Sequence, residues 1–125
     1  MTGSHATVVV LVAHGSRAEA ANDAHRAMSE RVATAGGVPV VPAFLELAEP
    51  SIGEGIDRAV ELGATTVRVI PYFLYPGRHV RDDIPRIVAE AAERHGAAAT
   101  IALAAHVGDD PRMVQLLAEL AQGRR

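Results

Sequence analysis

Two histidines follow closely on two apolar segments, and imidazole is a side chain suited to metal chemistry. His14 ends the run VVVLVAH, and His79 lies in the segment YPGRHV that follows VRVIPYF. Imidazole is the commonest metal ligand among protein side chains, and it accepts a proton near neutral pH. If the two apolar segments are neighbouring strands, their carboxyl ends meet at the sheet edge where open α/β proteins bind ligands. The two residues therefore predict a metal site.

Apolar segments and helix-like segments alternate four times along the chain. The first apolar segment, 7–13, is a continuous β-branched run, typical of a strand buried on both faces. Glycines, prolines and acidic residues mark the expected helix ends. The predicted strands are 7–13, 38–47, 66–73 and 99–105, and the predicted helices are 18–35, 50–63, 82–95 and 109–122. The third helix is expected to open on an acidic, proline-bearing turn at 82–85.

Strands that alternate with helices predict a parallel sheet, because each crossover returns to the same sheet edge. We expect an α/β fold with a small, open, four-stranded sheet in the order 2-1-3-4 and helices on both faces. Pro39 and Pro42 place the second strand at an edge, since proline removes a ladder donor. This order sets the strands that lead to His14 and His79 side by side and puts Glu46 next to the first strand. Two imidazoles and a carboxylate are predicted to converge.

Length and composition indicate one domain and exclude several classes of chemistry. We expect a single domain over 1–125, with residues 1–6 as a flexible tail. The chain has no Cys, which excludes thiolate chemistry, and its 12 basic residues are all Arg, which excludes a Schiff-base lysine. A net charge of -3 gives no reason to expect nucleic acid. The start lacks signal-peptide order and no apolar run has membrane-spanning length, so we expect a cytoplasmic protein without a membrane partner.

Three motifs resemble those of one enzyme family. AHGSR after the first strand, FLELAEPSI after the second and IPYFLYPGRHVRDDIP after the third are similar to segments of the short sirohydrochlorin chelatases. These are the CbiX-type cobaltochelatases and their siroheme ferrochelatase relatives. The resemblance, from about Val8 to Leu117, implies a class II chelatase half-lobe that forms a homodimer. It implies ATP-independent insertion of a divalent metal into sirohydrochlorin, in cobalamin or siroheme biosynthesis.

The resemblance also implies roles for the converging residues. His14 and His79 correspond to the metal-binding histidines of the family, and Glu46 to an assisting carboxylate. Insertion requires that the metal be held while it sheds water and that two pyrrole N–H protons leave. Nitrogen and oxygen ligands suit Co²⁺, Fe²⁺ and Ni²⁺ alike, so cobalt or iron is expected as substrate, with nickel as an alternative, and no organic cofactor is needed. Glu46 could ligate the metal, raise the basicity of a histidine or collect a proton.

Side chains around the two histidines suit the planar, polyanionic macrocycle that the resemblance implies. Three arginines lie within three residues of a candidate ligand, and guanidinium groups pair bidentately with carboxylates. An aromatic residue just before PGRH could pack on the ring face. A serine after the first histidine could cap the following helix or bind a carboxylate. The predicted substrate-binding residues are Ser16, Arg17, Tyr75, Arg78 and Arg81.

The remaining histidines and two rival hypotheses complete the prediction. His25 is expected on a polar helix face, away from the chemistry, and His95 at a helix C-terminus, where the dipole favours a cation. His106 departs from the family pattern and could add a ligand. One rival is a non-catalytic metal carrier that uses His14 and His79. The other is a small α/β phosphatase or hydrolase with His14 as nucleophile or base, but the chain lacks both an RHG order and a GxSxG elbow.

Overall fold

The computed structural model describes residues 6–124, with the side chain of His79 outside the described part. Its elements are β1 (Thr7–Ala13), α1 (Glu19–Gly36), β2 (Val40–Phe44), α2 (Ile52–Glu61), β3 (Thr66–Pro71), α3 (Arg78–His95), η1 (Gly96–Ala98), β4 (Thr100–Leu103), η2 (Val107–Asp109) and α4 (Pro111–Ala121). Of the predicted tail, residues 1–5 lie outside the described residues. Ala6 is held to the sheet, since its carbonyl accepts hydrogen bonds from the backbone N–H groups of Thr65 and Thr66.

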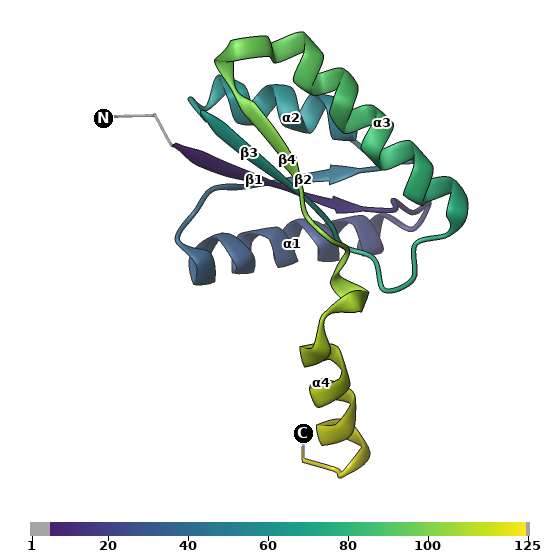
Figure 1. The fold of residues 1–125 in the computed structure, drawn as a ribbon. Coiled ribbons are helices and arrows are strands. Elements are labelled where there is room, and N and C mark those ends of the chain that lie inside the picture. The colour runs from purple at the N-terminus through teal and green to yellow at the C-terminus, as the bar shows by residue number, and fades with distance from the viewer. Residues whose placement is uncertain (1–5, 125) are drawn as a thin grey trace.

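The four strands form one parallel sheet in the order β2-β1-β3-β4, as the sequence predicts. Helix α1 lies on one face, and α2 and α3 lie on the other (Figure 1). The proline-bearing strand β2 is at an edge, with Pro42 opposite Leu11 of β1. The α/β prediction, the strand order and the placement of helices on both faces are confirmed.

The hydrophobic core lies between the sheet and the two helices α2 and α3. Alternate residues of β1 and β3 point to this side, and Ile52 and Ile56 of α2 pack against them with almost no exposure. A capping box starts α2: Ser51 Oγ accepts from the Glu54 N–H at 3.2 Å, and Glu54 Oε1 accepts from the Ser51 N–H at 2.9 Å. The apolar side of α2 thus holds one face of β1, β2 and β3.

Helix α1 covers the opposite face with polar side chains. Its buried residues are Asn22, His25 and Ser29, which share one side of the helix. His25 is 5% exposed, and its Nε2–H donates to the Leu11 carbonyl at 2.9 Å. The sequence places His25 on a polar helix face, and Asn22 and Ser29 make that face polar, but it is buried against the sheet. The three polar residues at helical spacing form the inner side of α1, and Ala-rich segments flank them.

Helix α3 begins earlier than predicted. It spans Arg78–His95, with Gly77 in extended conformation before it, whereas the sequence places the first turn at 82–85. The Arg81 N–H donates to the Gly77 carbonyl at 3.0 Å, so the turn that precedes Pro85 is already helical. Pro85 lies inside the helix and not in its first turn. Consequently His79 belongs to the first turn of α3 and not to a loop.

Asp57, in the middle of α2, joins this helix to the C-terminal end of α3. Its Oδ1 accepts from Arg94 Nη2 at 2.9 Å and from His95 Nε2 at 2.7 Å. The Arg94 guanidinium holds the pKa of Asp57 below its ordinary value. The predicted place of His95 at a helix C-terminus is confirmed.

The last helix, α4, stands away from the sheet (Figure 1). Asp110 caps it, with Oδ1 accepting from the Arg112 N–H at 2.8 Å, and Pro111 occupies its first turn. None of its residues is buried. Within the described residues, no helix combines the length and apolarity that crossing a membrane requires.

We predict that His25 makes folding sensitive to pH. Burial lowers the pKa of its imidazole below the ordinary value. His25 in the unfolded chain therefore binds a proton near pH 6.5, whereas His25 in the folded chain stays neutral at that pH. Because protonation favours the unfolded chain, the free energy of unfolding should fall as the pH drops below about 6.5. His25→Gln keeps an N–H donor for the Leu11 carbonyl but does not titrate. Urea unfolding at about pH 7.5 and 5.5 should show a smaller decrease in the free energy of unfolding for this variant than for the wild type. Equal falls in both proteins would contradict the prediction.

Candidate functional site

The carboxyl ends of β1 and β2 bring His14 and Glu46 into contact. Parallel pairing continues past the strands: the Leu45 N–H donates to the Ala13 carbonyl at 2.9 Å, and the Glu46 N–H donates to the His14 carbonyl at 3.0 Å. The side chains also meet, with Nε2 of His14 3.1 Å from Oε2 of Glu46. They are 53% and 55% exposed. An imidazole and a carboxylate thus stand together at an open sheet edge.

Gly15 permits this approach. Its φ is +98°, a left-handed conformation that side chains rarely adopt. A Cβ at this position would also collide with the carbonyl oxygen of Glu46. Glycine is therefore required both by the turn after His14 and by the close passage of the second loop.

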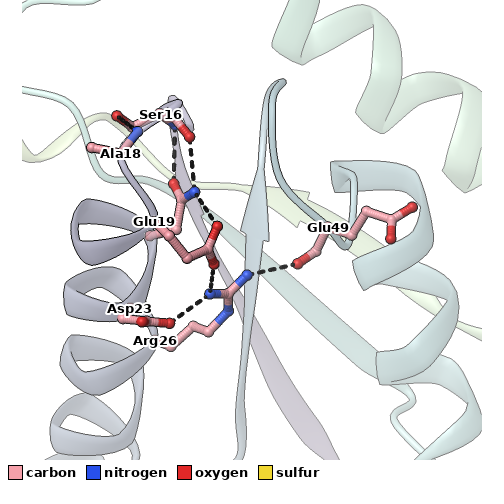
Figure 2. Close-up of polar contacts among 7 residues, drawn as sticks. Ser16, Ala18, Glu19, Asp23, Arg26 and Glu49 are labelled. Atoms are coloured by element: carbon pink, nitrogen blue, oxygen red, sulfur yellow. Dashed lines mark hydrogen bonds and ion pairs between the residues drawn. The ribbon is translucent and has the colours of Figure 1, made fainter.

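Helix α1 holds the loop after β1 through hydrogen bonds between Asn22 and the backbone of Ser16. The Ser16 N–H donates to Asn22 Oδ1 at 3.0 Å, and Asn22 Nδ2 donates to the Ser16 carbonyl at 2.8 Å. Figure 2 shows Ser16 above the start of the helix, where its Oγ accepts from the Ala18 N–H at 3.0 Å. Ser16 does not cap α1 as one of its two predicted roles requires, because its hydroxyl contacts Ala18, which is itself the N-cap residue, and α1 has no side-chain cap. Asn22 is 2% exposed, so both backbone groups of Ser16 are satisfied by a buried amide.

Arg26 ties α1 to the loop that carries Glu46. Its Nη1 donates to Glu19 and Asp23 at 2.8 and 2.9 Å, and its Nη2 reaches the Glu49 carbonyl at 3.4 Å (Figure 2). The guanidinium also lies over the Phe44 ring, 5.1 Å from its centroid. Its hydrogen bond to Glu19 holds the pKa of that carboxyl below its ordinary value. The two loops of the candidate site therefore share α1 as a support.

The loop after β3 runs alongside His14. The Tyr72 N–H donates to the Val12 carbonyl at 2.8 Å, which extends the β1–β3 pairing by one residue. The Phe73 ring meets the His14 ring edge to face, with centroids 6.3 Å apart. His79 follows in the first turn of α3. The structure thus places the backbone of His79 at the same end of the sheet, and its side chain lies outside the described part.

The other predicted residues are exposed at this end of the sheet. Arg17 follows the β1 loop, Arg78 and Arg81 lie in the first turn of α3, and Tyr75 is 91% exposed. Tyr75 and Arg81 line a shallow pocket together with His106 and Asp109. His106 pairs instead with Asp109, with Nε2 and Oδ1 3.3 Å apart. Among the described side chains, no group of three or more His, Cys, Asp or Glu residues is arranged to hold a metal ion.

Sequence reasoning missed three residues that shape the site. These are Asn22, which clamps the β1 loop, Arg26, which links both loops, and Leu47, which is exposed beside Glu46 with a φ of +65°. The spacing of Asn22, His25 and Ser29 was the available signal for the first, since it matches one side of a helix. The sequence gave no indication of the role of Leu47, because a positive φ at a leucine cannot be inferred from the residue type.

The sequence model of the CbiX family matches residues 8–123. The chain belongs to the CbiX family. The chloroplastic sirohydrochlorin ferrochelatase of Arabidopsis thaliana is 42% identical over 86 residues, which are 68% of this chain and 38% of the relative. The CbiX protein of Marinobacter aquaeolei VT8 is 30% identical, with a TM-score of 0.80 over 94% of this chain and 96% of that one. SirB from Bacillus subtilis subspecies spizizenii, in complex with cobalt, is 29% identical, with a TM-score of 0.82 over 95% of this chain and 51% of that one.

These findings confirm the family and the fold that the three motifs predict. They also show a difference in length. The chain spans 38%, 42% and 62% of three curated relatives, which are named sirohydrochlorin ferrochelatases or cobaltochelatases. Membership of the family is therefore established for the chain, and the activity follows as a proposal.

We predict that Asn22→Ala loosens the loop that follows His14. The substitution leaves the N–H and carbonyl of Ser16 without their buried partner, which should lower the free energy of unfolding by about 1–3 kcal/mol. It should also speed hydrogen exchange at the Ser16 amide. Asp23→Ala is the matched control, because it removes an exposed partner of Arg26 one residue away and should change stability by less than about 0.5 kcal/mol. Equal exchange at Ser16 in all three proteins would contradict the clamp.

Proposed function

We propose that this protein is a sirohydrochlorin metal chelatase, a lyase that inserts cobalt or iron into the macrocycle. The observation that carries the proposal is the exposed contact between His14 and Glu46 at the carboxyl edge of the sheet, in a chain of the CbiX family. Relatives named sirohydrochlorin ferrochelatase and sirohydrochlorin cobaltochelatase support it. SirB is known in complex with cobalt and with Fe³⁺, which supports these metals as the substrate.

The proposed metal-binding residues are His14, Glu46 and His79. The first two stand 3.1 Å apart, and the third lies in the first turn of α3, beyond the loop that contacts His14 through Phe73. Imidazole nitrogen and carboxylate oxygen are suitable ligands for divalent cobalt and iron. A set of three protein ligands leaves coordination positions open. The macrocycle nitrogens can then replace water on the metal before the protein releases it.

The same residues can receive the protons that insertion releases. Two pyrrole N–H bonds break, metal–nitrogen bonds form in the ring, and two protons leave as the divalent ion enters. An imidazole that gives up the metal regains a lone pair able to accept one proton. The contact between His14 Nε2 and Glu46 Oε2 offers a path from imidazole to carboxylate, and both side chains reach solvent. We therefore assign proton transfer as well as metal binding to this pair.

The substrate is proposed to lie across the exposed residues of the same edge. Leu47, Leu74 and Tyr75 are 56%, 50% and 91% exposed, and they offer apolar contacts for a flat ring. Arg17, Arg78 and Arg81 are proposed to bind the carboxylates at the edge of the macrocycle, and the Ser16 hydroxyl is proposed as a further hydrogen-bond donor to them.

The proposal includes a homodimer with two such edges. The chain matches 51% of the SirB chain at a TM-score of 0.82, so a second copy would supply the remaining half of a comparable assembly. An anionic tetrapyrrole is the proposed partner, without nucleic acid or membrane. A cytoplasmic location and the lack of an organic cofactor stay predictions from the sequence.

The proposed function is tested by a metal-insertion assay that is monitored through the absorption spectrum of the macrocycle. Mixed anaerobically with sirohydrochlorin and Co²⁺ or Fe²⁺, the protein should accelerate the spectral change of the macrocycle. His14→Ala and His79→Ala should each slow it by about 100-fold or more, because each removes a ligand and proton acceptor. Glu46→Gln, which keeps the shape but not the charge, should slow it by about 10–100-fold. No acceleration with any metal, nickel included, would overturn the proposal.

A matched control and a rival outcome sharpen this test. His95→Ala removes a histidine whose ring contacts Asp57 at the other end of α3, and it should retain full activity while losing some stability. Metal binding without any change in the tetrapyrrole spectrum would favour the non-catalytic carrier instead.

We predict that Tyr75 contributes to binding of the ring and not to folding. Because its side chain is 91% exposed, Tyr75→Ala should change the free energy of unfolding by less than about 0.5 kcal/mol. It should raise KM for sirohydrochlorin and leave kcat nearly unchanged, since the contact is made equally before and during insertion. Tyr75→Phe should behave as wild type. An unchanged KM in Tyr75→Ala would remove Tyr75 from the substrate surface.

A further inference from the structure

A second histidine–carboxylate pair lies close to the candidate site. Nε2 of His106 stands 3.3 Å from Oδ1 of Asp109, which belongs to turn η2. Phe73 contacts both neighbourhoods: its ring meets the His14 ring, and its carbonyl accepts from the Gly108 N–H at 3.1 Å. The metal binding proposed above uses the pair at His14 and leaves the pair at His106 without a role.

Turn η2 is seated on the loop after β3 by close backbone packing. A Cβ on Gly108 would collide with the carbonyl oxygen of Leu74, so the two segments touch through their main chains. The Ala104 N–H donates to the Val69 carbonyl at 2.9 Å, which carries the β3–β4 pairing one residue past β4. His106 is therefore held at the carboxyl edge of the sheet, the edge that also carries the candidate site.

A shallow pocket opens beside this pair, and we call it the His106 pocket. Its volume is about 370 Å³, and its lining residues are Tyr75, Pro76, Arg81, His106 and Asp109. Because Tyr75 is 91% exposed and belongs to the surface proposed for the ring, the mouth of the pocket adjoins that surface. A group at the edge of a bound ring can therefore reach into the pocket.

An apolar cleft continues the His106 pocket between α3 and the end of β4. The cleft has a volume of about 210 Å³ and shares Arg81 and His106 with the pocket. Its other walls include Val80 and Ile84 of α3 and Leu103 of β4. Polar groups at the mouth and apolar walls behind them match a short hydrocarbon arm that ends in a charged group.

Arg81 supplies a positive charge that is available to a ligand. Within the described part of the chain, no hydrogen bond or ion pair engages its guanidinium. Arg86 of the same helix differs, because its guanidinium pairs with Asp83 at 3.5 Å and with Glu90 at 3.4 Å. A guanidinium binds a carboxylate through two parallel N–H donors, so Arg81 is suited to an anionic ligand.

His106 supplies a donor that depends on protonation. A carboxylate only accepts hydrogen bonds, so the ring nitrogen that faces Asp109 carries the proton of a neutral imidazole, and the other nitrogen offers only a lone pair. Imidazole takes up a second proton between about pH 5 and 8, and both nitrogens then donate. A protonated His106 can therefore bind an anion beside Arg81 while it keeps its contact with Asp109.

The other charged groups near His106 leave the pocket open to an anion. The Asp109 side chain is 72% exposed and already faces the imidazole. At the start of α4, Asp110 and Arg112 are bonded to each other at 2.9 and 2.8 Å. Among the described residues that line the pocket, Arg81 and a protonated His106 thus outweigh the charge of Asp109.

We propose that the His106 pocket binds a carboxylate arm at the edge of the macrocycle, with Arg81 and protonated His106 as the two donors. The inference rests on the proposed function and adds a specificity-determining residue to it. A ring that lies on Leu74 and Tyr75 places its edge at the mouth of the pocket. The methylene groups of the arm then contact the apolar cleft, and its carboxylate meets the two cations. Binding near neutral pH takes up a proton at His106, so the affinity for the macrocycle rises as the pH falls.

Binding of metal-free sirohydrochlorin, followed anaerobically through its absorption spectrum, tests the proposal. Between about pH 6 and 8, the Kd of the wild type should rise about 10-fold more than the Kd of His106→Gln, which cannot take up the proton. His106→Arg carries a fixed cation, and its Kd at about pH 8 should match that of the wild type at about pH 6. All three proteins share the remaining titrating groups, so their effect cancels in the comparison. An equal pH dependence in the wild type and His106→Gln would overturn the proposal.

A pair of arginine variants separates the pocket from the general charge of α3. Arg81→Gln should raise the Kd for the metal-free macrocycle by about 10-fold, because it removes a charged donor from the His106 pocket. Arg86→Gln is the matched control, since it removes the same charge from the same helix outside the pocket. It should change the Kd by less than about 2-fold, because salt screens exposed charges. Equal losses of affinity in the two variants would overturn the assignment of Arg81 to the pocket.

Propionate is a probe for the pocket that needs no macrocycle. Added at about pH 6, it should shift the Cε1–H resonance of the His106 ring, which the NMR spectrum of His106→Gln identifies by its absence. Propionamide has the same shape without the charge and should leave the resonance in place. No shift with propionate would overturn the pocket as a carboxylate site. A shift with propionate, combined with equal macrocycle affinity in the wild type and His106→Gln, would assign the pocket to a free carboxylate and overturn the macrocycle arm. None of these measurements uses a metal, so a failed metal-insertion assay leaves their results unaffected.

Discussion

One backbone contact organises this end of the molecule. The Glu46 N–H donates to the His14 carbonyl at 3.0 Å, which continues the β1–β2 pairing beyond both strands and draws two loops together. Gly15 makes the contact possible, because its left-handed φ and missing side chain leave room for the Glu46 carbonyl. Only with the loops held this closely can the His14 and Glu46 side chains meet at 3.1 Å. The chemistry of the pair therefore depends on pairing of the main chain.

The two helix layers have different tasks in supporting this contact. Helix α2 buries apolar side chains such as Ile56 and stabilises the sheet by removing hydrophobic area from water. Helix α1 buries Asn22 and His25, and the amide of Asn22 and Nε2 of His25 have hydrogen-bond partners, whereas Nδ1 of His25 has none within the described residues. Those partners are the main chain at Ser16 and Leu11. The α2 side of the sheet thus holds the main apolar cluster, and the α1 side, which also buries Leu11 and Phe44, holds the site loops.

Local patterns in the sequence predicted most of the elements, and the failures have physical reasons. The β-branched run of β1 and the Pro-Ser opening of α2 led to correct assignments, because both depend on neighbouring residues. The start of α3 was misplaced at 82–85. Proline favours a first turn, and nothing local shows that Gly77 and Arg81 already form the turn before it. His25 was assigned only to a polar helix face, because its burial depends on β1 and β2 and not on its neighbours in the chain.

By itself, the sequence determined the parallel α/β order, the edge position of β2, the family and the residues able to do chemistry, since periodicity, proline placement and motif spacing are properties of the chain. Only the tertiary structure decided which residues meet. His14 and Glu46 are 32 positions apart, and their contact follows from strand register and the close passage at Gly15. The outward course of α4 was likewise undetermined by its amphipathic pattern. That pattern shows only that α4 has an apolar side, whereas the contact of Gly108 with the loop after β3 decides where the helix points.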